Sequence, residues 1–111
     1  MRKREYLGQF ELMVLLAVLQ AGDNAYGVPI AREIEDTTQK EVALGSIYAA
    51  LERLEAKELV ASALGEPTAE RGGRAKKYFR VTAKGHREIR DARRTLVKLW
   101  RGIPEFNGVE S

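Results

Sequence analysis

Residues 70–82 decide the fold, and they read Glu-Arg-Gly-Gly-Arg-Ala-Lys-Lys-Tyr-Phe-Arg-Val-Thr. The glycine pair Gly72-Gly73 supplies the positive φ values that a hairpin tip requires. From residue 77 to residue 82 the side chains alternate, with Phe79 and Val81 on the same face, as in a half-buried strand. The apolar run before Pro67 is the natural partner of this strand. The sequence therefore predicts a two-stranded β-hairpin over residues 59–82 with a long basic tip.

Three helices are predicted before the hairpin. Nearly every position from Phe10 to Ala21 is apolar, so a helix over about residues 9–21 must be covered on all sides, in part by a second subunit. Pro29 is suited to the first turn of a second helix, which runs from about residue 26 to residue 38. After a short extended piece around Val42, a third helix covers about residues 45–58 and carries one apolar stripe, formed by Ile47, Leu51 and Leu54.

A fourth helix is expected over residues 83–101. Helices two and three, joined by a short connection and followed by a basic hairpin, make a winged helix-turn-helix. The predicted fold is therefore mainly α with a small β-hairpin. Residues 1–82 form the winged helix-turn-helix domain, residues 83–101 a dimerisation helix, and residues 102–111 a flexible tail.

Composition narrows the function further. The chain of 111 residues has no cysteine, which excludes disulfides and thiolate metal sites, and we expect a cytoplasmic protein without a membrane span. The net charge is +3, but residues 71–101 hold twelve basic and two acidic side chains. Such asymmetry favours a polyanionic partner, although a basic helix that is simply solvated remains the alternative.

Several short motifs occur together in an order that resembles the PadR-like transcriptional regulators. This family comprises bacterial repressors with a winged-helix domain and a C-terminal dimerisation helix, and many members carry a longer helical domain after it. The motifs span about residues 6–86. They are Leu7-Gly8-Gln9-Phe10-Glu11-Leu12, Ala25-Tyr26-Gly27-Val28-Pro29-Ile30, Gly45-Ser46-Ile47-Tyr48-Ala49-Ala50-Leu51-Glu52-Arg53-Leu54-Glu55, Leu64-Gly65-Glu66-Pro67-Thr68 and Glu70-Arg71-Gly72-Gly73-Arg74.

The resemblance implies that the third helix enters the major groove of DNA. A groove about 12 Å wide admits a helix with a slim leading face. Ser46 could contact a base, or it could cap the helix. The tyrosine hydroxyls could reach phosphates or lie at the rim of the core, and Arg53 could bind a phosphate or pair with an acid on its own helix. The candidate residues of this part are Tyr26, Gly45, Ser46, Tyr48, Ala49 and Arg53.

The hairpin would be the wing. Its glycine tip allows close approach to DNA, and its cations could neutralise phosphates or enter the minor groove. The alternative is a solvated surface turn. The candidate wing residues are Arg71, Gly72, Gly73, Arg74, Lys76 and Lys77.

The fourth helix has an apolar face without an obvious partner in one subunit, so we expect a homodimer. Trp100 could also line a pocket for a planar apolar effector, as the resemblance implies, or serve only as an interface anchor. The candidate interface residues are Phe10, Met13, Ile89, Leu96, Leu99 and Trp100.

Catalysis is not expected, and no cofactor is implied. His86 has no serine or cysteine motif beside it, Gly72-Gly73 lacks the phosphate-loop pattern, and Glu33, Glu35 and Asp36 lie on a helix without metal-ligand spacing. The competing hypothesis is a winged-helix protein-interaction adaptor that binds no DNA. Such an adaptor has no need for a cluster of wing cations.

Overall fold

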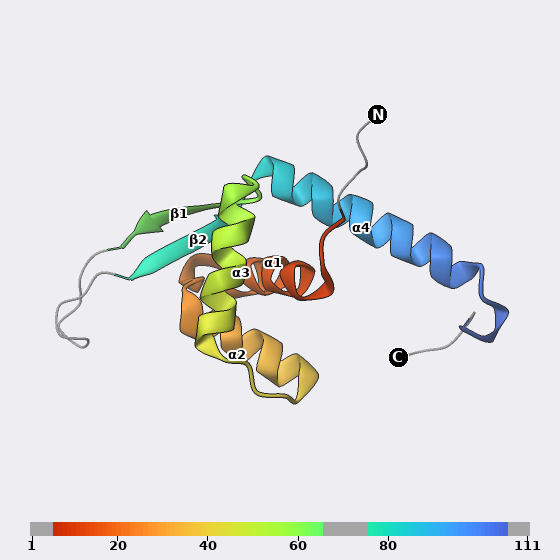
Figure 1. The fold of residues 1–111 in the computed structure, drawn as a ribbon, viewed down its shortest axis with the longest axis horizontal. Helices are drawn as coiled ribbons and strands as arrows, with labels where there is room; N and C mark the ends of the chain where they lie inside the picture. The colour runs from red at the N-terminus through yellow and green to blue at the C-terminus, as the bar shows by residue number, and fades with distance from the viewer. Residues whose placement is uncertain (1–5, 66–75, 107–111) are drawn as a thin grey trace.

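The computed structural model describes residues 6–65 and 76–106 and is mainly α-helical with one two-stranded antiparallel sheet (Figure 1). Each predicted helix and strand is present within one or two residues of its expected bounds. The elements are α1 Gln9–Ala21, a 3₁₀ turn Gly22–Asn24, α2 Gly27–Thr38, α3 Leu44–Ala56, β1 Val60–Leu64, β2 Lys77–Val81, α4 Ala83–Arg101 and a 3₁₀ turn Pro104–Phe106.

The core is built around α1. Val14 and Leu15 have no exposed surface, and Val18 is only 2% exposed. Helices α2 and α3 and strand β2 all contact α1, and they bury side chains such as Ile30, Leu51 and Phe79 against it. Burying side chains of this size stabilises a fold by about 1.5–3 kcal/mol each. The apolar run that predicted α1 is therefore the centre of the fold.

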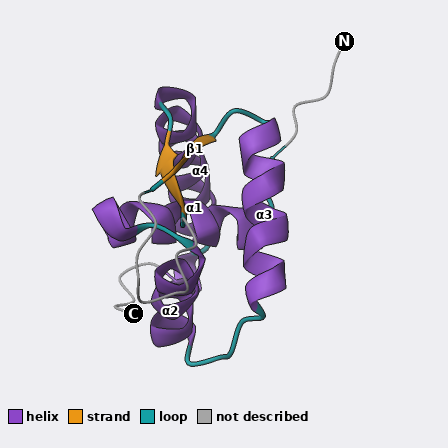
Figure 2. Ribbon diagram, turned by 90° about the vertical axis from the view of Figure 1, so that its left-hand side faces the viewer, coloured by secondary structure: helices purple, strands orange, loops and turns teal. Residues whose placement is uncertain are grey.

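A short turn sets the direction of α3 relative to α2. Gln39 ends α2 in a left-handed conformation with φ 61°, and its N–H donates to the Glu35 carbonyl. The Glu35 carboxylate then accepts a 2.8 Å hydrogen bond from the Val42 N–H. Residues 39–43 connect the two helices in this way, and α3 lies along one side of the molecule (Figure 2). Helices α2 and α3 thus form the predicted helix-turn-helix.

The hairpin joins the helical body at two points. Strands β1 and β2 pair in the register Val60 with Val81, and Phe79 and Val81 face the core as their alternation predicted. The Phe79 N–H also donates a 2.8 Å bond to the Ala25 carbonyl, just before α2. The base of the wing is therefore held between β1 and the start of α2.

Helix α4 begins against the end of α3 and then leaves the body (Figure 1). Thr82 caps α4 by accepting from the Gly85 N–H, and its hydroxyl donates to the Glu58 carbonyl at 2.7 Å. Gly85 is the one buried residue of α4, packed so tightly that a Cβ there would overlap the Leu59 carbonyl oxygen. Among the described helices, none has an apolar stretch of the length that a membrane crossing requires.

Gly85→Ala should destabilise the protein, because its methyl group would meet the Leu59 carbonyl and approach Val81. We expect a loss of about 2 kcal/mol, within the usual range for overpacking. Gly45→Ala is the matched control, since Gly45 lies in the first turn of α3 with no atom within 4 Å of the new Cβ. That variant should gain roughly 0.5 kcal/mol. Urea unfolding measures both, and an equal response of the two variants would contradict this account of the α4 start.

Candidate nucleic-acid interface

Helix α3 has one buried face and one slim exposed face. Ile47, Ala50, Leu51 and Leu54 are buried, because they recur at the spacing that places them on one side of the helix. The opposite side exposes small residues in its first two turns, Gly45, Ser46 and Ala49, and then Glu52. A helix with so little bulk on its leading face fits the width of a major groove.

Ser46 does not cap α3. The N-cap position is Ala43, which makes no side-chain cap hydrogen bond, so Ser46 lies within the first turn. Its backbone N–H donates to the Ala43 carbonyl at 3.0 Å. The capping alternative for Ser46 is therefore wrong. Its exposed hydroxyl makes no hydrogen bond to any residue that the structure describes, and it is available to an outside partner.

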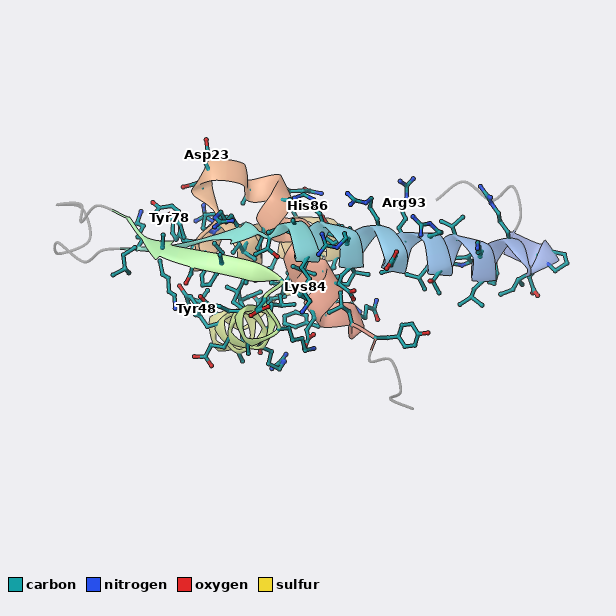
Figure 3. The ribbon with its side chains drawn as sticks, turned by 90° about the horizontal axis from the view of Figure 1, so that it is seen from above. Asp23, Tyr48, Tyr78, Lys84, His86 and Arg93 are labelled. Atoms are coloured by element: carbon teal, nitrogen blue, oxygen red, sulfur yellow. The ribbon has the colours of Figure 1, made fainter. Side chains whose placement is uncertain are left out.

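Three tyrosines gather around the start of α2. The ring and hydroxyl of Tyr48 lie against Gly27, where any Cβ would overlap them, yet the residue remains 41% exposed. Tyr26 is the N-cap residue of α2 and meets Tyr78 of β2 edge to face, with ring centroids 5.5 Å apart. The aromatic cluster thus fills the angle between α2, α3 and the hairpin. Figure 3 shows Tyr48 on the α3 side, while His86 and Arg93 of α4 point to the opposite side.

The base of the wing carries the two described basic candidates. Lys76 Nζ lies 4.4 Å from the centroid of the Tyr26 ring, in cation–π geometry. Lys77 Nζ lies 3.8 Å from a Glu55 carboxylate oxygen, and the Ser62 hydroxyl donates to the other oxygen at 2.6 Å. The remaining wing candidates lie outside the described residues: Arg71, Gly72, Gly73 and Arg74.

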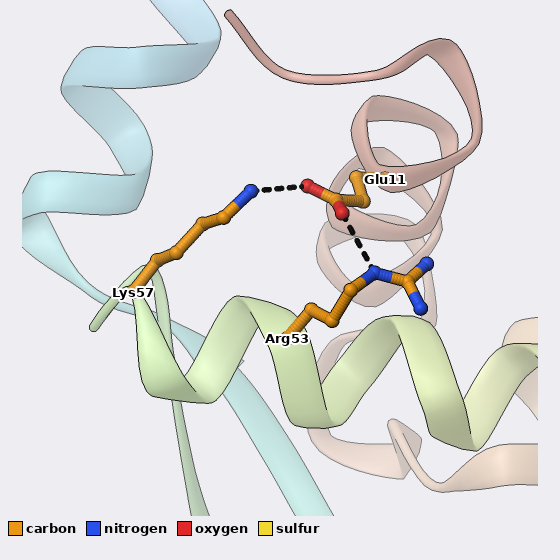
Figure 4. A network of polar contacts seen from close by, with 3 residues as sticks. All are labelled: Glu11, Arg53 and Lys57. Carbon is orange, nitrogen blue, oxygen red and sulfur yellow. Dashed lines mark hydrogen bonds and ion pairs between the residues drawn. The ribbon is translucent and has the colours of Figure 1, made fainter. Parts of the chain in front are cut away.

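Arg53 is held by an acid from another helix, not by a neighbour on α3 (Figure 4). Its Nε donates to Glu11 Oε2 of α1 at 2.8 Å, and Lys57 Nζ donates to Glu11 Oε1 at 2.8 Å. The Glu11 side chain is 12% exposed, against 52% for Arg53 and 40% for Lys57. We call these three residues the Glu11 clasp.

The clasp shifts the acidity of Glu11. Burial works to raise the pKa of this carboxyl group, but the hydrogen bonds and positive charges of Lys57 and Arg53 outweigh it. The pKa of Glu11 therefore lies below its ordinary value. Glu11 is the one charged residue of α1, and it carries a negative charge at neutral pH.

Large apolar side chains remain exposed on α4 and α1. Phe10, Met13 and Ile89 are partly covered by the core. Leu99 and Trp100, in contrast, are 64% and 55% exposed. A groove between α1 and α2 has an apolar wall formed by Met13, Leu16 and Ile34. The exposed apolar residues of α1 and the C-terminal region are Leu16, Leu19, Leu96, Leu99, Trp100, Ile103 and Phe106.

The sequence did not single out four residues that contribute to the exposed face of α3, the wing base or the apolar face of α1. Glu11 was the lone charge in an apolar helix, which is a usable signal for a buried ion pair. Glu52 follows Ala49 on the exposed face by one turn. The alternation along residues 77–82 puts Tyr78 on the face opposite to Phe79, but its contact with Tyr26 depends on the fold. Leu16 stood within an apolar run that gave no indication of which side would stay uncovered.

Comparison with known proteins identifies the relatives of this fold. The family model described as "Transcriptional regulator PadR-like family" matches residues 15–91. A PadR-like transcriptional regulator from Bacillus cereus superposes with TM-score 0.70 at 21% identity, covering 91% of this chain and 93% of that one. A PadR family transcription regulator from Clostridium difficile superposes with TM-score 0.69 at 22% identity, covering 89% of this chain and 99% of that one. No protein of curated function matches the sequence.

Glu11→Gln should lower stability at neutral pH. Because folding lowers the pKa of Glu11, its stabilisation is complete above the unfolded value of about 4.3 and is lost as the pH falls through the folded value. We expect a loss of about 0.5–1 kcal/mol at pH 7, limited by the exposure of both cations. The difference between variant and wild type should shrink below about pH 4. Urea unfolding across pH measures this, with the exposed Asp23→Asn as the control. If the difference in unfolding free energy between Glu11→Gln and the wild type stayed constant below about pH 4, the lowered pKa of Glu11 would be wrong.

Proposed function

We propose that this chain, which belongs to the PadR-like family of transcriptional regulators, binds double-stranded DNA sequence-specifically as a homodimer. Its role would be that of a repressor at an inverted-repeat operator. The observation that carries the proposal is the slim exposed face of α3 beside a wing base with basic and tyrosine side chains. Residues 1–82 would form the DNA-binding unit and residues 83–101 the dimerisation helix.

In this proposal α3 supplies sequence specificity. Ser46 would donate to or accept from a base edge, and Ala49 would contact a thymine methyl group. Gly45 allows the helix to approach the groove floor closely. The Tyr48 hydroxyl lies against Gly27 in the first turn of α2, and Tyr26 is the N-cap residue of that helix. Both hydroxyls would bind phosphates together with the positive end of the helix dipole. Arg53 would bind a phosphate at the flank of α3.

The wing supplies affinity that does not depend on sequence. Arg71, Arg74, Lys76 and Lys77 would neutralise phosphates, and the glycine pair would let the tip approach the backbone. Glu55 pairs with Lys77 at 3.8 Å, and Lys76 lies over the Tyr26 ring, so a phosphate would compete with a carboxylate at Lys77 and with an aromatic ring at Lys76. An adaptor without DNA binding, the competing function, predicts no effect of any of these residues on a DNA complex.

The second subunit would cover the exposed apolar residues of α1 and α4. Leu96, Leu99 and Trp100 form too large an apolar surface to face water in a monomer. A dimer also presents two recognition helices to a two-fold repeated site. An effector site for a planar apolar compound would need both subunits, because Trp100 is 55% exposed in one.

Variants of the wing and of α3 should affect DNA binding differently. Arg74→Ala should weaken binding to operator and to random DNA by similar factors, and reduce the slope of log K against log salt by about 0.9 for each phosphate that is no longer neutralised. Ser46→Ala should weaken only the operator complex, by about 1 kcal/mol or more. Gel shifts over a salt series, with an operator selected from a random pool, measure both. Binding unaffected by Arg74→Ala would exclude the wing role.

Leu96→Glu should dissociate the dimer, because it places a charge in the apolar face of α4. Sedimentation at micromolar concentration should give about twice the mass of one chain for the wild type and a single chain mass for the variant. Lys98→Glu is the matched control, because Lys98 is two residues after Leu96 and its side chain therefore lies on the opposite face of α4. It should remain a dimer. A monomeric wild type would rule out the proposed assembly.

A further inference from the structure

We propose that Glu11 limits the affinity of α3 for DNA by competing with phosphates for Arg53 and Lys57. This inference rests on the proposed DNA-binding function and concerns the strength and selectivity of that same surface. Two cations on a recognition helix would ordinarily add sequence-independent affinity. In this protein a carboxylate from α1 binds both of them at 2.8 Å.

The two cations lie where a phosphate could reach them. Arg53 lies in α3 seven residues after Ser46, and Lys57, eleven residues after Ser46, is the C-cap residue of this helix, so the three follow one side of it in a stripe. Ser46 is exposed at the start of this stripe, and a shallow groove beside it is lined by Phe10, Glu41, Val42, Ala43 and Ser46. Since Arg53 is about half exposed, a phosphate could approach it from outside while Glu11 lies on its inner side.

Glu11 is well placed to retain both cations. It is anchored in the first turn of α1, at the edge of the core, and it is mostly buried. Each of its oxygens accepts one hydrogen bond, and the Arg53 bond uses Nε and draws the base of the guanidinium inward (Figure 4). The three residues of the Glu11 clasp therefore carry a net charge of only +1. A phosphate that binds Arg53 or Lys57 must displace the Glu11 carboxylate or share the cation with it.

A purely structural ion pair predicts a different result. Removing such a pair lowers stability and leaves DNA binding by the folded protein unchanged. Under the proposal, stability and affinity change in opposite directions: the fold becomes weaker and the complex with random DNA becomes tighter. The added contacts should also steepen the salt dependence, because each new phosphate contact contributes about 0.9 to the slope.

Glu11→Asp separates the clasp from the overall charge. This substitution keeps the net charge but shortens the side chain by one methylene, so the carboxylate can no longer reach both cations. On a random duplex we expect about two- to fivefold tighter binding for Glu11→Asp, the range of one exposed ion pair, and a similar or larger gain for Glu11→Gln. Glu105→Gln removes one exposed negative charge in the turn Pro104–Phe106, at the end of α4 that is far from α3 and the hairpin (Figure 1), and should change affinity much less.

A double-mutant cycle with Arg53→Gln completes the test. If Glu11 acts through Arg53, the gain from Glu11→Asp should largely disappear in the Arg53→Gln background. Circular dichroism melts confirm that each variant is folded at the assay temperature, and Glu11→Gln replaces Glu11→Asp if the latter is not. Unchanged affinity in both Glu11 variants, or a gain equal to that of Glu105→Gln, would overturn the inference. Failure of the wild type to bind any duplex would instead refute the proposed function.

Discussion

The burial of α1 is the constraint on which the rest of the subunit depends. With Val14, Leu15 and Val18 fully enclosed, α2, α3 and β2 must each present an apolar face to the same helix. That requirement leaves the opposite face of α3 exposed, and only small residues occupy its leading edge. The surface that we assign to DNA therefore follows from the way the core is filled.

The single charged residue of α1, Glu11, affects both the stability of the fold and the proposed binding of DNA. Glu11 lies at the one end of α1 where a carboxylate can remain partly hydrated and still reach α3. Its two ion pairs fix the C-terminal half of α3 against α1, and they also reduce the positive potential of that flank. The N-terminal half of α3 carries Ser46 and Ala49 and holds no cation, while Glu41 lines the groove beside Ser46 and Glu52 is exposed one turn after Ala49. Base contacts would therefore weigh more in the balance between specific and unspecific binding.

The local elements could be predicted from sequence because their signals are strong and short-range. Pro29 marks the start of α2, alternation around Phe79 marks β2, and the stripe through Ile47 and Leu54 marks α3. Contacts between distant residues could not be predicted in this way. The expectation that Arg53 would find an acid on its own helix considered only neighbours along α3, whereas its partner lies 42 residues earlier. A cap at Ser46 would require α3 to begin at Ile47, whereas the helix begins three residues earlier, at Leu44, with Ala43 as its N-cap.

The direction of α4 links the proposed dimer to the recognition helix. The Thr82 hydroxyl bonds the Glu58 carbonyl, Lys84 Nζ bonds the Lys57 carbonyl at 3.0 Å, and Gly85 packs on Leu59. These contacts fix the first turn of α4 to the C-terminal end of α3, within one residue of the Glu11 clasp. In a two-fold dimer built on α4, the separation of the two α3 helices follows from this angle, and so does the spacing of the half-sites that they can occupy. A change in how the α4 helices pack would therefore reach α3 through backbone contacts at its end, without any rearrangement of the core around α1.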